Sequence, residues 1–225
     1  MGAPCLAVPS DVLTELLPAC PVVLPCVRCV GGSRWYEAGK RAFDVMAAAV
    51  LLAMAAIPLC VFALAIAVES PGCPLYRQRR IGKDGNEFTL FKLRTMRADA
   101  EAGGPRWAAV ADGRATRLGA WLRQHRLDEL PQLLNVLRGD MSLVGPRPER
   151  PEFARAFRPM IVGWDERTLV RPGITGLAQV NGGYSLLPAE KARIDLDYIE
   201  RRSFALDAAI LVRTVRVALG GEGAR

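Results

Sequence analysis

An uninterrupted apolar stretch of 24 residues, Val45–Val68, constrains this chain more than any other feature. It holds no charged side chain, and its length matches the roughly 20 apolar residues that a helix needs to cross a bilayer. The alternative is a core helix of a soluble protein. Because a helix without a polar face leaves no side for water, we predict a membrane segment.

The flanks of this stretch distinguish three kinds of membrane segment. A cleaved signal peptide is disfavoured, because the stretch begins after 44 residues, is too long and lacks a small-residue cleavage context. Basic residues, which favour the cytoplasm, lie on both sides: Lys40 and Arg41 before it, and a cluster between residues 77 and 83 after it. Ile57-Pro58 lies near the middle, where proline removes a backbone donor. These features favour a re-entrant helix–break–helix over residues 40–70, broken near Pro58, rather than a straight span.

The first 39 residues follow no signal-peptide pattern. Five prolines interrupt any helix, and no basic residue precedes Arg28. Four of the six cysteines lie here, but the pair Cys26 and Cys29 has no second pair or histidine nearby, which argues against zinc. We predict that residues 1–39 form a poorly ordered extension that is dispensable for activity, and that the cysteines are free thiols of a reducing compartment.

Composition narrows the function classes. The 225 residues include 30 Lys and Arg against 23 Asp and Glu, a net charge of +7, and 51% are hydrophobic. This excludes a disordered chain and points to an anionic partner: nucleic acid, a phosphate-bearing substrate or an anionic membrane face. The basic residues are dispersed, without a basic helix or stacking aromatics, which argues against nucleic acid. The single histidine, His125, excludes a multi-histidine metal site and argues against a Ser/His triad.

A hairpin is predicted directly after the membrane segment. Two strand-like runs, 75–79 and 88–93, flank the turn signal Asp84-Gly85. In the second run Lys92 and Arg94 share a face with apolar neighbours. They are either candidate substrate-binding cations or charges that protect a solvated edge strand.

The clearest soluble helix lies within residues 126–138. Leucines recur there at helical spacing, and Pro131 must stand in the first turn, so the helix begins near Asp128 or Glu129 and ends at Gly139. Two carboxylates at a helix N-terminus are ordinarily caps. They could equally form a catalytic pair that holds a divalent cation at an anion-binding helix end.

Two arginines stand in rigid turns. Pro146 and Pro148 clamp Arg147 in an extended backbone, and Arg171 opens the sequence Arg-Pro-Gly. An arginine held in this way loses little entropy on binding phosphate in a bidentate manner. Either segment could be a structural turn, but together with Lys92 and Arg94 they suggest a diphosphate site.

From Pro188 the chain is helical and amphipathic. The final segment, 204–219, is too short and too charged to span a membrane, so it lies at a membrane interface or packs on the soluble domain. The sequence thus predicts a mixed, mainly α fold. It combines a re-entrant membrane segment with a small cytosolic α/β domain, residues 71–225, that ends in interfacial helices.

Four strings in this order resemble the bacterial sugar transferases, the monotopic polyprenyl-phosphate phosphoglycosyl transferases: KRAFDVMAAAVLL, FKLRTM, LDELPQLLNVLRGDMSLVGPRP and RPGITGLAQVNG. They cover Lys40 to about residue 217. The resemblance implies that residues 71–225 are catalytic and transfer sugar 1-phosphate from a UDP-sugar to polyprenyl (undecaprenyl) phosphate, releasing UMP. The length is similar to the minimal catalytic form, without a multi-spanning N-terminal domain.

The family resemblance also implies residue roles. Asp128 attacks the β-phosphorus and forms a phosphosugar–aspartyl intermediate, Glu129 assists, and both are expected to bind Mg²⁺. Lys92, Arg147 and Arg171 are expected to neutralise phosphate charge. One departure is the membrane break, which commonly reads Ser-Pro and here reads Ile57-Pro58.

The implied location is the bacterial inner membrane, with the catalytic domain on the cytoplasmic face. The implied process is the start of glycan assembly: exopolysaccharide, O-antigen, capsule or glycoprotein. Inner-membrane lipid is an expected partner and a homodimer is a possible assembly. The main competing function is a non-catalytic membrane adaptor of the same pathway. The sequence does not identify the sugar.

Overall fold

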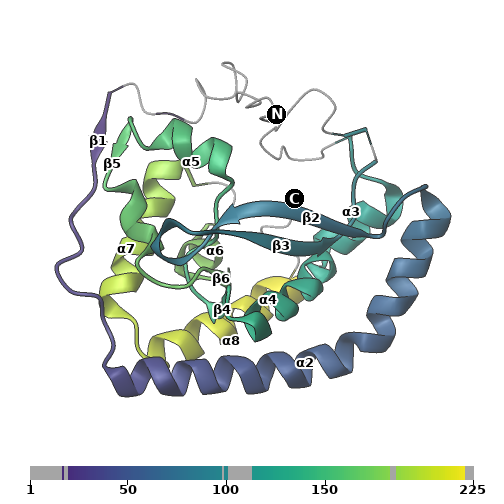
Figure 1. Cartoon of the computed structure of the whole chain (residues 1–225), viewed down its shortest axis with the longest axis horizontal. Coiled ribbons are helices and arrows are strands. Elements are labelled where there is room, and N and C mark those ends of the chain that lie inside the picture. Colours follow the sequence, from purple (N-terminus) through teal and green to yellow (C-terminus); the bar gives the residue numbers. More distant parts are fainter. Residues whose placement is uncertain (1–16, 18–19, 98, 101–112, 183–185, 221–225) are drawn as a thin grey trace.

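The computed structural model describes residues 17, 20–97, 99–100, 113–182 and 186–220. In this part of the chain the fold is mainly helical with three two-stranded sheets, which agrees with the predicted mixed, mainly α class (Figure 1). The elements in chain order are β1 (Val22–Val23), α2 (Arg34–Glu69), β2 (Leu75–Ile81), η1 (Lys83–Gly85), β3 (Glu87–Leu93), α3 (Arg117–Gln124), η2 (Leu127–Gln132), α4 (Leu133–Arg138), β4 (Ser142–Val144), α5 (Pro151–Phe157), β5 (Ile161–Val162), η3 (Trp164–Thr168), β6 (Gly173–Thr175), α6 (Leu177–Asn181), α7 (Pro188–Arg201) and α8 (Phe204–Gly220).

Helix α2 contains the apolar stretch and is 36 residues long. It starts at Arg34, because the side chain of Ser33 accepts a hydrogen bond from the Tyr36 N–H at 3.2 Å. The helix continues through Pro58, but Figure 1 shows that its axis bends part way along, so that its last turns point in a different direction from its first turns. Proline leaves the carbonyl four residues earlier without a helical partner and is a common cause of such a bend. The structure therefore has a bent helix where the sequence predicted a broken one.

Apolar side chains of α2 face outwards over most of its length. Only 6% of its most apolar window is buried, and Met54, Ile57, Leu64 and Val68 are strongly exposed. Among the described residues, α2 is the single helix that is long and apolar enough to cross a membrane. These observations support membrane association.

The polar side chains at the start of α2 bind the rest of the protein. Arg41 donates to the carbonyls of Val136 and Leu137 at 2.6 and 3.0 Å, at the end of α4. The carboxylate of Asp44 is buried and accepts from the Leu143 N–H at 3.2 Å, in β4. One side of α2 is therefore part of the folded domain.

Part of the predicted extension is also packed on this domain. β1 pairs in parallel with β5, and farther along the Val27 N–H donates to Glu166 at 2.6 Å and the Gly31 N–H to the Ile199 carbonyl at 2.8 Å. Residues 20–33 thus form a strap across β5, η3 and α7. Residues 1–16, 18 and 19 lie outside the described part of the chain. The five cysteines within it are free thiols, as predicted.

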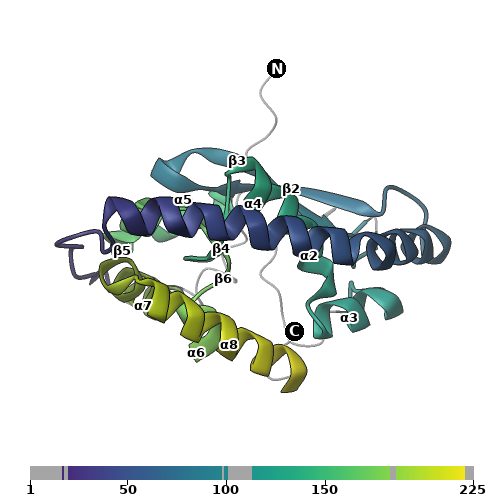
Figure 2. The ribbon, with the colours of Figure 1, turned by 90° about the horizontal axis from the view of Figure 1, so that it is seen from below.

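The predicted hairpin is present. β2 and β3 pair antiparallel from Leu75 opposite Leu93 to Ile81 opposite Glu87, and the turn passes through Asp84 with φ of 56°. β4 and β6 form a parallel pair. Figure 2 places the hairpin and α8 on opposite sides of α2.

Two apolar clusters hold these elements together. The larger cluster joins α4, α5, α7 and both short parallel sheets, and Ala48 of α2 is fully buried in it. The smaller cluster joins the far half of α2 to β3 and α3 through Ile66, Leu93 and Leu122. α8 buries Asp207 and Ile210 and exposes Phe204, Val212 and Val215, so it packs on the domain with one face and leaves an apolar face uncovered.

Candidate active site

The paired carboxylates lie at the start of η2, between Leu127, which packs against the smaller apolar cluster, and Leu130, which packs against the larger one. The chain reverses at Arg126, which has φ of 56°, and Asp128 and Glu129 then form the first turn. The predicted helix is present, but its first part is a 3-10 segment and regular α-helix begins at Leu133. Its end at Gly139, in the left-handed region with φ of 96°, is confirmed.

Glu129 is buried and paired with two cations. Its Oε1 accepts from Lys92 Nζ at 2.8 Å and from Arg147 Nη2 at 2.7 Å, while Oε2 lies 3.4 Å from Arg147 Nη1. Burial alone would raise the pKa of Glu129, but the charges of Arg147 and Lys92 outweigh it and hold the pKa well below its usual range. Glu129 is therefore ionised and neutralised by its partners.

Asp128 has a different environment. It is buried, and within the described residues no hydrogen bond or ion pair reaches its carboxylate. Burial raises the pKa of Asp128 above its usual value, although the charge of Lys92 acts against this effect, and the charge of Glu129 raises the pKa further. Adjacent carboxylates whose environments separate their pKa values are typical of paired catalytic roles.

Arg123 joins this site from α3, and the sequence did not indicate it. It lies in α3, which packs against η2, and its charge lowers the pKa of Asp128. Within the described chain the Arg123 side chain makes no hydrogen bond or ion pair. It stands five positions before Asp128 in a stretch with several basic residues, and no spacing rule distinguishes it from its neighbours.

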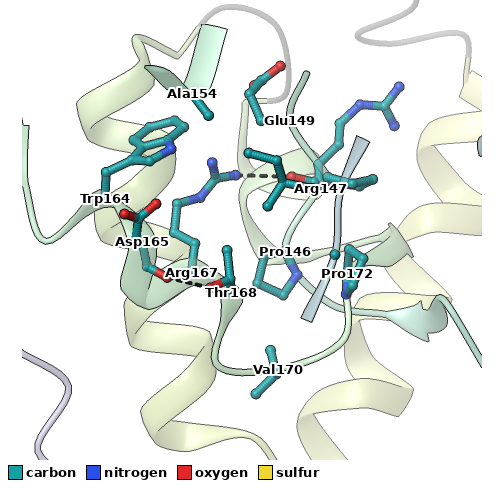
Figure 3. A pocket seen from close by; sticks show the side chains of 13 residues that line it. Pro146, Arg147, Glu149, Ala154, Trp164, Asp165, Arg167, Thr168, Val170 and Pro172 are labelled. Atoms are coloured by element: carbon teal, nitrogen blue, oxygen red, sulfur yellow. Dashed lines mark hydrogen bonds between the residues drawn. The ribbon is translucent and has the colours of Figure 1, made fainter. Parts of the chain in front are cut away.

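The loop Gly145–Pro148 fixes Arg147. The Gly145 N–H donates to the Thr175 carbonyl and the Gly173 N–H to the Pro146 carbonyl, both at 2.9 Å. A Cβ at Gly145 would lie 2.5 Å from the Arg171 carbonyl oxygen, so only glycine fits. A shallow pocket adjoins this loop, with Pro146, Arg147 and Arg167 among its lining residues (Figure 3).

Two predicted substrate-binding residues lie elsewhere. Arg94 donates to the Ser70 carbonyl at 2.6 Å and to the Pro71 carbonyl at 3.0 Å, beyond the end of α2. Arg171 donates to the Gly139 carbonyl at 3.0 Å, after the end of α4. The structure brings Lys92, Asp128, Glu129 and Arg147 together, and it gives Arg94 and Arg171 contacts at helix ends.

The predicted magnesium site has two carboxylates to draw on. No group of three or more His, Cys, Asp or Glu side chains that could hold a metal occurs among the described residues. Glu129 is committed to its two cations, whereas the Asp128 carboxylate is open. This donor set fits Mg²⁺, which usually keeps several waters and takes one or two carboxylates together with substrate phosphates.

Comparison with known proteins gives consistent matches. The profile of one family, described as bacterial sugar transferase, matches residues 35–221. The UDP-N-acetylgalactosamine-undecaprenyl-phosphate N-acetylgalactosaminephosphotransferase of Aeromonas hydrophila is 41% identical over 83% of this chain and 45% of its own length.

Two further relatives differ in length. The UDP-glucose:undecaprenyl-phosphate glucose-1-phosphate transferase of Caulobacter vibrioides is 46% identical over 82% of this chain and 71% of its own. The exopolysaccharide production protein PSS of Rhizobium leguminosarum bv. phaseoli is 40% identical over 78% of this chain and 92% of its own. The chain thus spans less than half of the Aeromonas relative and most of the other two.

Proposed function

Because this chain belongs to the bacterial sugar transferase family, we propose that it transfers sugar 1-phosphate from a UDP-sugar to undecaprenyl or another polyprenyl phosphate and releases UMP. The observation that carries the proposal is the buried Asp128–Glu129 pair, in which one carboxylate is neutralised by Lys92 and Arg147 and the other is open. A purely structural pair of caps would not need two partly buried cations beside it.

In the first step an ionised Asp128 oxygen attacks the β-phosphorus of the UDP-sugar. A bond forms between that oxygen and the phosphorus, and the bond to the oxygen bridging the two phosphates breaks, so UMP leaves with the bridging oxygen. The product on the protein is a phosphosugar–aspartyl group. The open carboxylate of Asp128 suits this role, since a carboxylate bound by two cations is a poorer nucleophile.

In the second step an oxygen of polyprenyl phosphate attacks the same phosphorus. The bond to Asp128 breaks, which regenerates the carboxylate and gives polyprenyl diphosphate sugar. Arg123, which has no ion partner within the described chain, is suited to bind a phosphate during these steps. Lys92 and Arg147 provide positive charge next to the reacting groups while Glu129 holds them in place.

We propose that Asp128, with Glu129 beside it, holds Mg²⁺ together with the donor diphosphate. The ion when bound supplies charge neutralisation for the transferred phosphoryl group and the leaving UMP. Removal of Mg²⁺ with a chelator should abolish UMP release, and added Mg²⁺ should restore it.

We propose that α2 is a re-entrant anchor in the inner membrane, which its bend supports, and that the catalytic domain lies on the cytoplasmic face, which the basic residues on both flanks favour. Such an anchor would place the site at the level of the lipid headgroups, where the acceptor phosphate lies. Single cysteines near Lys40 and Arg80 should then react with a membrane-impermeant reagent from the same side. Labelling from opposite sides would replace this topology with a true span.

Asp128→Asn tests the chemistry directly. The variant should lose UMP release almost completely, whereas Asp165→Asn, an exposed carboxylate in η3, should keep it. Substantial turnover by Asp128→Asn would remove this residue as the nucleophile. Initial rates should follow ping-pong kinetics, and intersecting double-reciprocal lines would argue against the covalent intermediate.

The sugar and the pathway need separate assays. The named relatives act on UDP-N-acetylgalactosamine and UDP-glucose, so a panel of UDP-sugars that includes both is the first choice. We propose that the reaction starts glycan assembly, such as exopolysaccharide. Absence of UMP release with every donor would favour the adaptor function. Light scattering of the detergent-solubilised protein tests the predicted homodimer.

A further inference from the structure

Arg167 is a buried arginine outside the carboxylate pair. It lies in η3, and its Nε and Nη2 atoms lie 2.8 and 2.7 Å from the same oxygen of Asp195, a fully buried residue of α7. Its guanidinium carbon lies 4.4 Å from the centre of the Trp164 ring. Arg167 is thus fixed from two directions, and Figure 3 shows it beside Trp164 with its guanidinium directed towards the Arg147 loop.

A third contact links this buried arginine to the site. Arg167 Nη2 donates to the Arg147 backbone carbonyl at 3.2 Å, the dashed line that joins the two residues in Figure 3. The side chain of Arg147 in turn binds Glu129 at 2.7 Å. A continuous series of contacts therefore runs from Asp195 through Arg167 and Arg147 to Glu129.

The orientation of the Arg147 carbonyl determines the position of the Arg147 side chain. Prolines on both sides restrict the backbone, which leaves rotation at Arg147 itself as the main freedom of this short segment. Fixing its carbonyl sets the direction in which the Arg147 side chain leaves the backbone. A small change in that direction would move the guanidinium off Glu129.

We propose that Arg167, held by Asp195 and Trp164, is a positioning residue that fixes the backbone of Arg147 for the transfer reaction. This inference rests on the proposed function for its kinetic part. Neither Arg167 nor Asp195 contacts the Asp128–Glu129 pair, so both act through Arg147. An ion pair that served stability alone would need no bond to this loop, and a buried ion pair is often no more stabilising than apolar side chains of similar volume.

A double-mutant cycle separates positioning from general stabilisation. Arg167→Lys keeps the charge, but one ammonium group cannot reproduce the planar contacts with Asp195 and the carbonyl. We expect kcat for UMP release to fall about 10-fold or more, with KM for the polyprenyl acceptor little changed. In an Arg147→Lys background the same substitution should lower kcat by less than about 2-fold. Arg167 acts through the Arg147 side chain, and that side chain is already replaced in this background.

The matched control is Arg158→Lys. Arg158 pairs with Asp165 of the same η3 segment at 2.8 Å, but this pair is exposed and remote from the Arg147 carbonyl. Adding Arg158→Lys should change kcat by less than about 2-fold relative to the parent protein, whether that parent is wild type or Arg147→Lys. If the fold losses in kcat of the two single variants simply multiply in the double variant Arg167→Lys/Arg147→Lys, the positioning role is overturned.

Hydrogen exchange of residues 143–150 tests the same idea without turnover. Exchange of this segment should be faster in Arg167→Lys and unchanged in Arg158→Lys, and equal exchange in both would overturn the proposal. If Arg167→Lys does not fold, Trp164→Phe should show the same faster exchange, since it weakens the stacking and leaves every charge in place. A wild-type protein that releases no UMP would contradict the proposed function, while the exchange comparison would still decide the role of Arg167.

Discussion

Replacing Lys92 by methionine tests whether two cations are needed to hold Glu129 as a buried anion. Lys92 Nζ lies 2.8 Å from Glu129 Oε1, with side-chain exposures of 15% and 9%. Removing one partner of a buried ion pair typically costs about 3–5 kcal/mol. Because Arg147 still binds Glu129, we expect the lower end, a loss of about 3 kcal/mol in the free energy of unfolding near neutral pH.

The pH dependence gives this prediction its sign. The pKa of Glu129 is lowered by folding, so its ionised form stabilises the protein above the unfolded pKa of about 4.5, and this contribution is lost as the pH falls towards the folded pKa. Without Lys92 the pKa of Glu129 in the folded protein rises, so its ionised form stabilises the folded state less. The stability difference between wild type and Lys92→Met should therefore be largest near neutral pH and shrink below about pH 4.5.

Denaturant unfolding of the full chain in detergent, followed by tryptophan fluorescence, measures both effects. Arg79→Met is the matched control on the same hairpin, because Arg79 pairs with Glu87 at 3.0 Å with exposures of 70% and 42%. It should cost less than about 1 kcal/mol at any pH. If Lys92→Met behaves like this control, or if its deficit does not change on acidification, Glu129 is not held as an anion by Lys92.

Three further outcomes are expected. The acid limb of the pH profile of kcat should lie above pH 3.8, the ordinary pKa of aspartate, because burial raises the pKa of Asp128 and only its ionised form attacks. Arg123→Met should move this limb to higher pH, because the charge of Arg123 lowers the pKa of Asp128. If the limb does not move, Arg123 lies outside the site. Asn135→Leu should lower the free energy of unfolding by about 3 kcal/mol, because its buried amide binds backbone atoms of β3 at 3.1 and 2.7 Å; a loss under about 1 kcal/mol in the same unfolding assay would contradict this. Pro58→Leu should straighten α2 and abolish same-side labelling of its two flanks, and unchanged labelling would show that the bend does not depend on the proline.

Local motifs predicted most of the candidate site. The turn at Asp84, the glycine end of α4 and the rigid backbone around Arg147 depend on neighbouring residues, so sequence was sufficient to place them. Arg94 shows the limit of this approach. Strand alternation placed it beside Lys92, but β3 ends at Leu93, and one residue later the side chain turns to the end of α2.

Pairings between distant segments could not be predicted. The sequence predicted an amphipathic helix from Pro188 but not that Asp195 within it is buried, which depends on the counter-charge of Arg167, 28 residues earlier. The strap is a second case, since its prolines exclude a helix but not an extended chain whose backbone N–H groups bind Glu166 and neighbouring carbonyls. In both cases the deciding partner lies far away in sequence.

Helix α2 packs on the domain with one side and exposes apolar side chains on the other, and this matters for making a water-soluble fragment. A fragment that starts after Glu69 would lack the exposed apolar surface of α2, but it would also lose the hydrogen bonds that α2 makes to the domain. The groups left without these partners are the Val136 and Leu137 carbonyls, the Leu143 N–H and the Asp207 carboxylate. It would open a hole where Ala48 fills the interior. Solubility is better sought by replacing exposed side chains such as Met54, Ile57 and Leu64 with polar ones, leaving Arg41, Asp44 and Ala48 untouched.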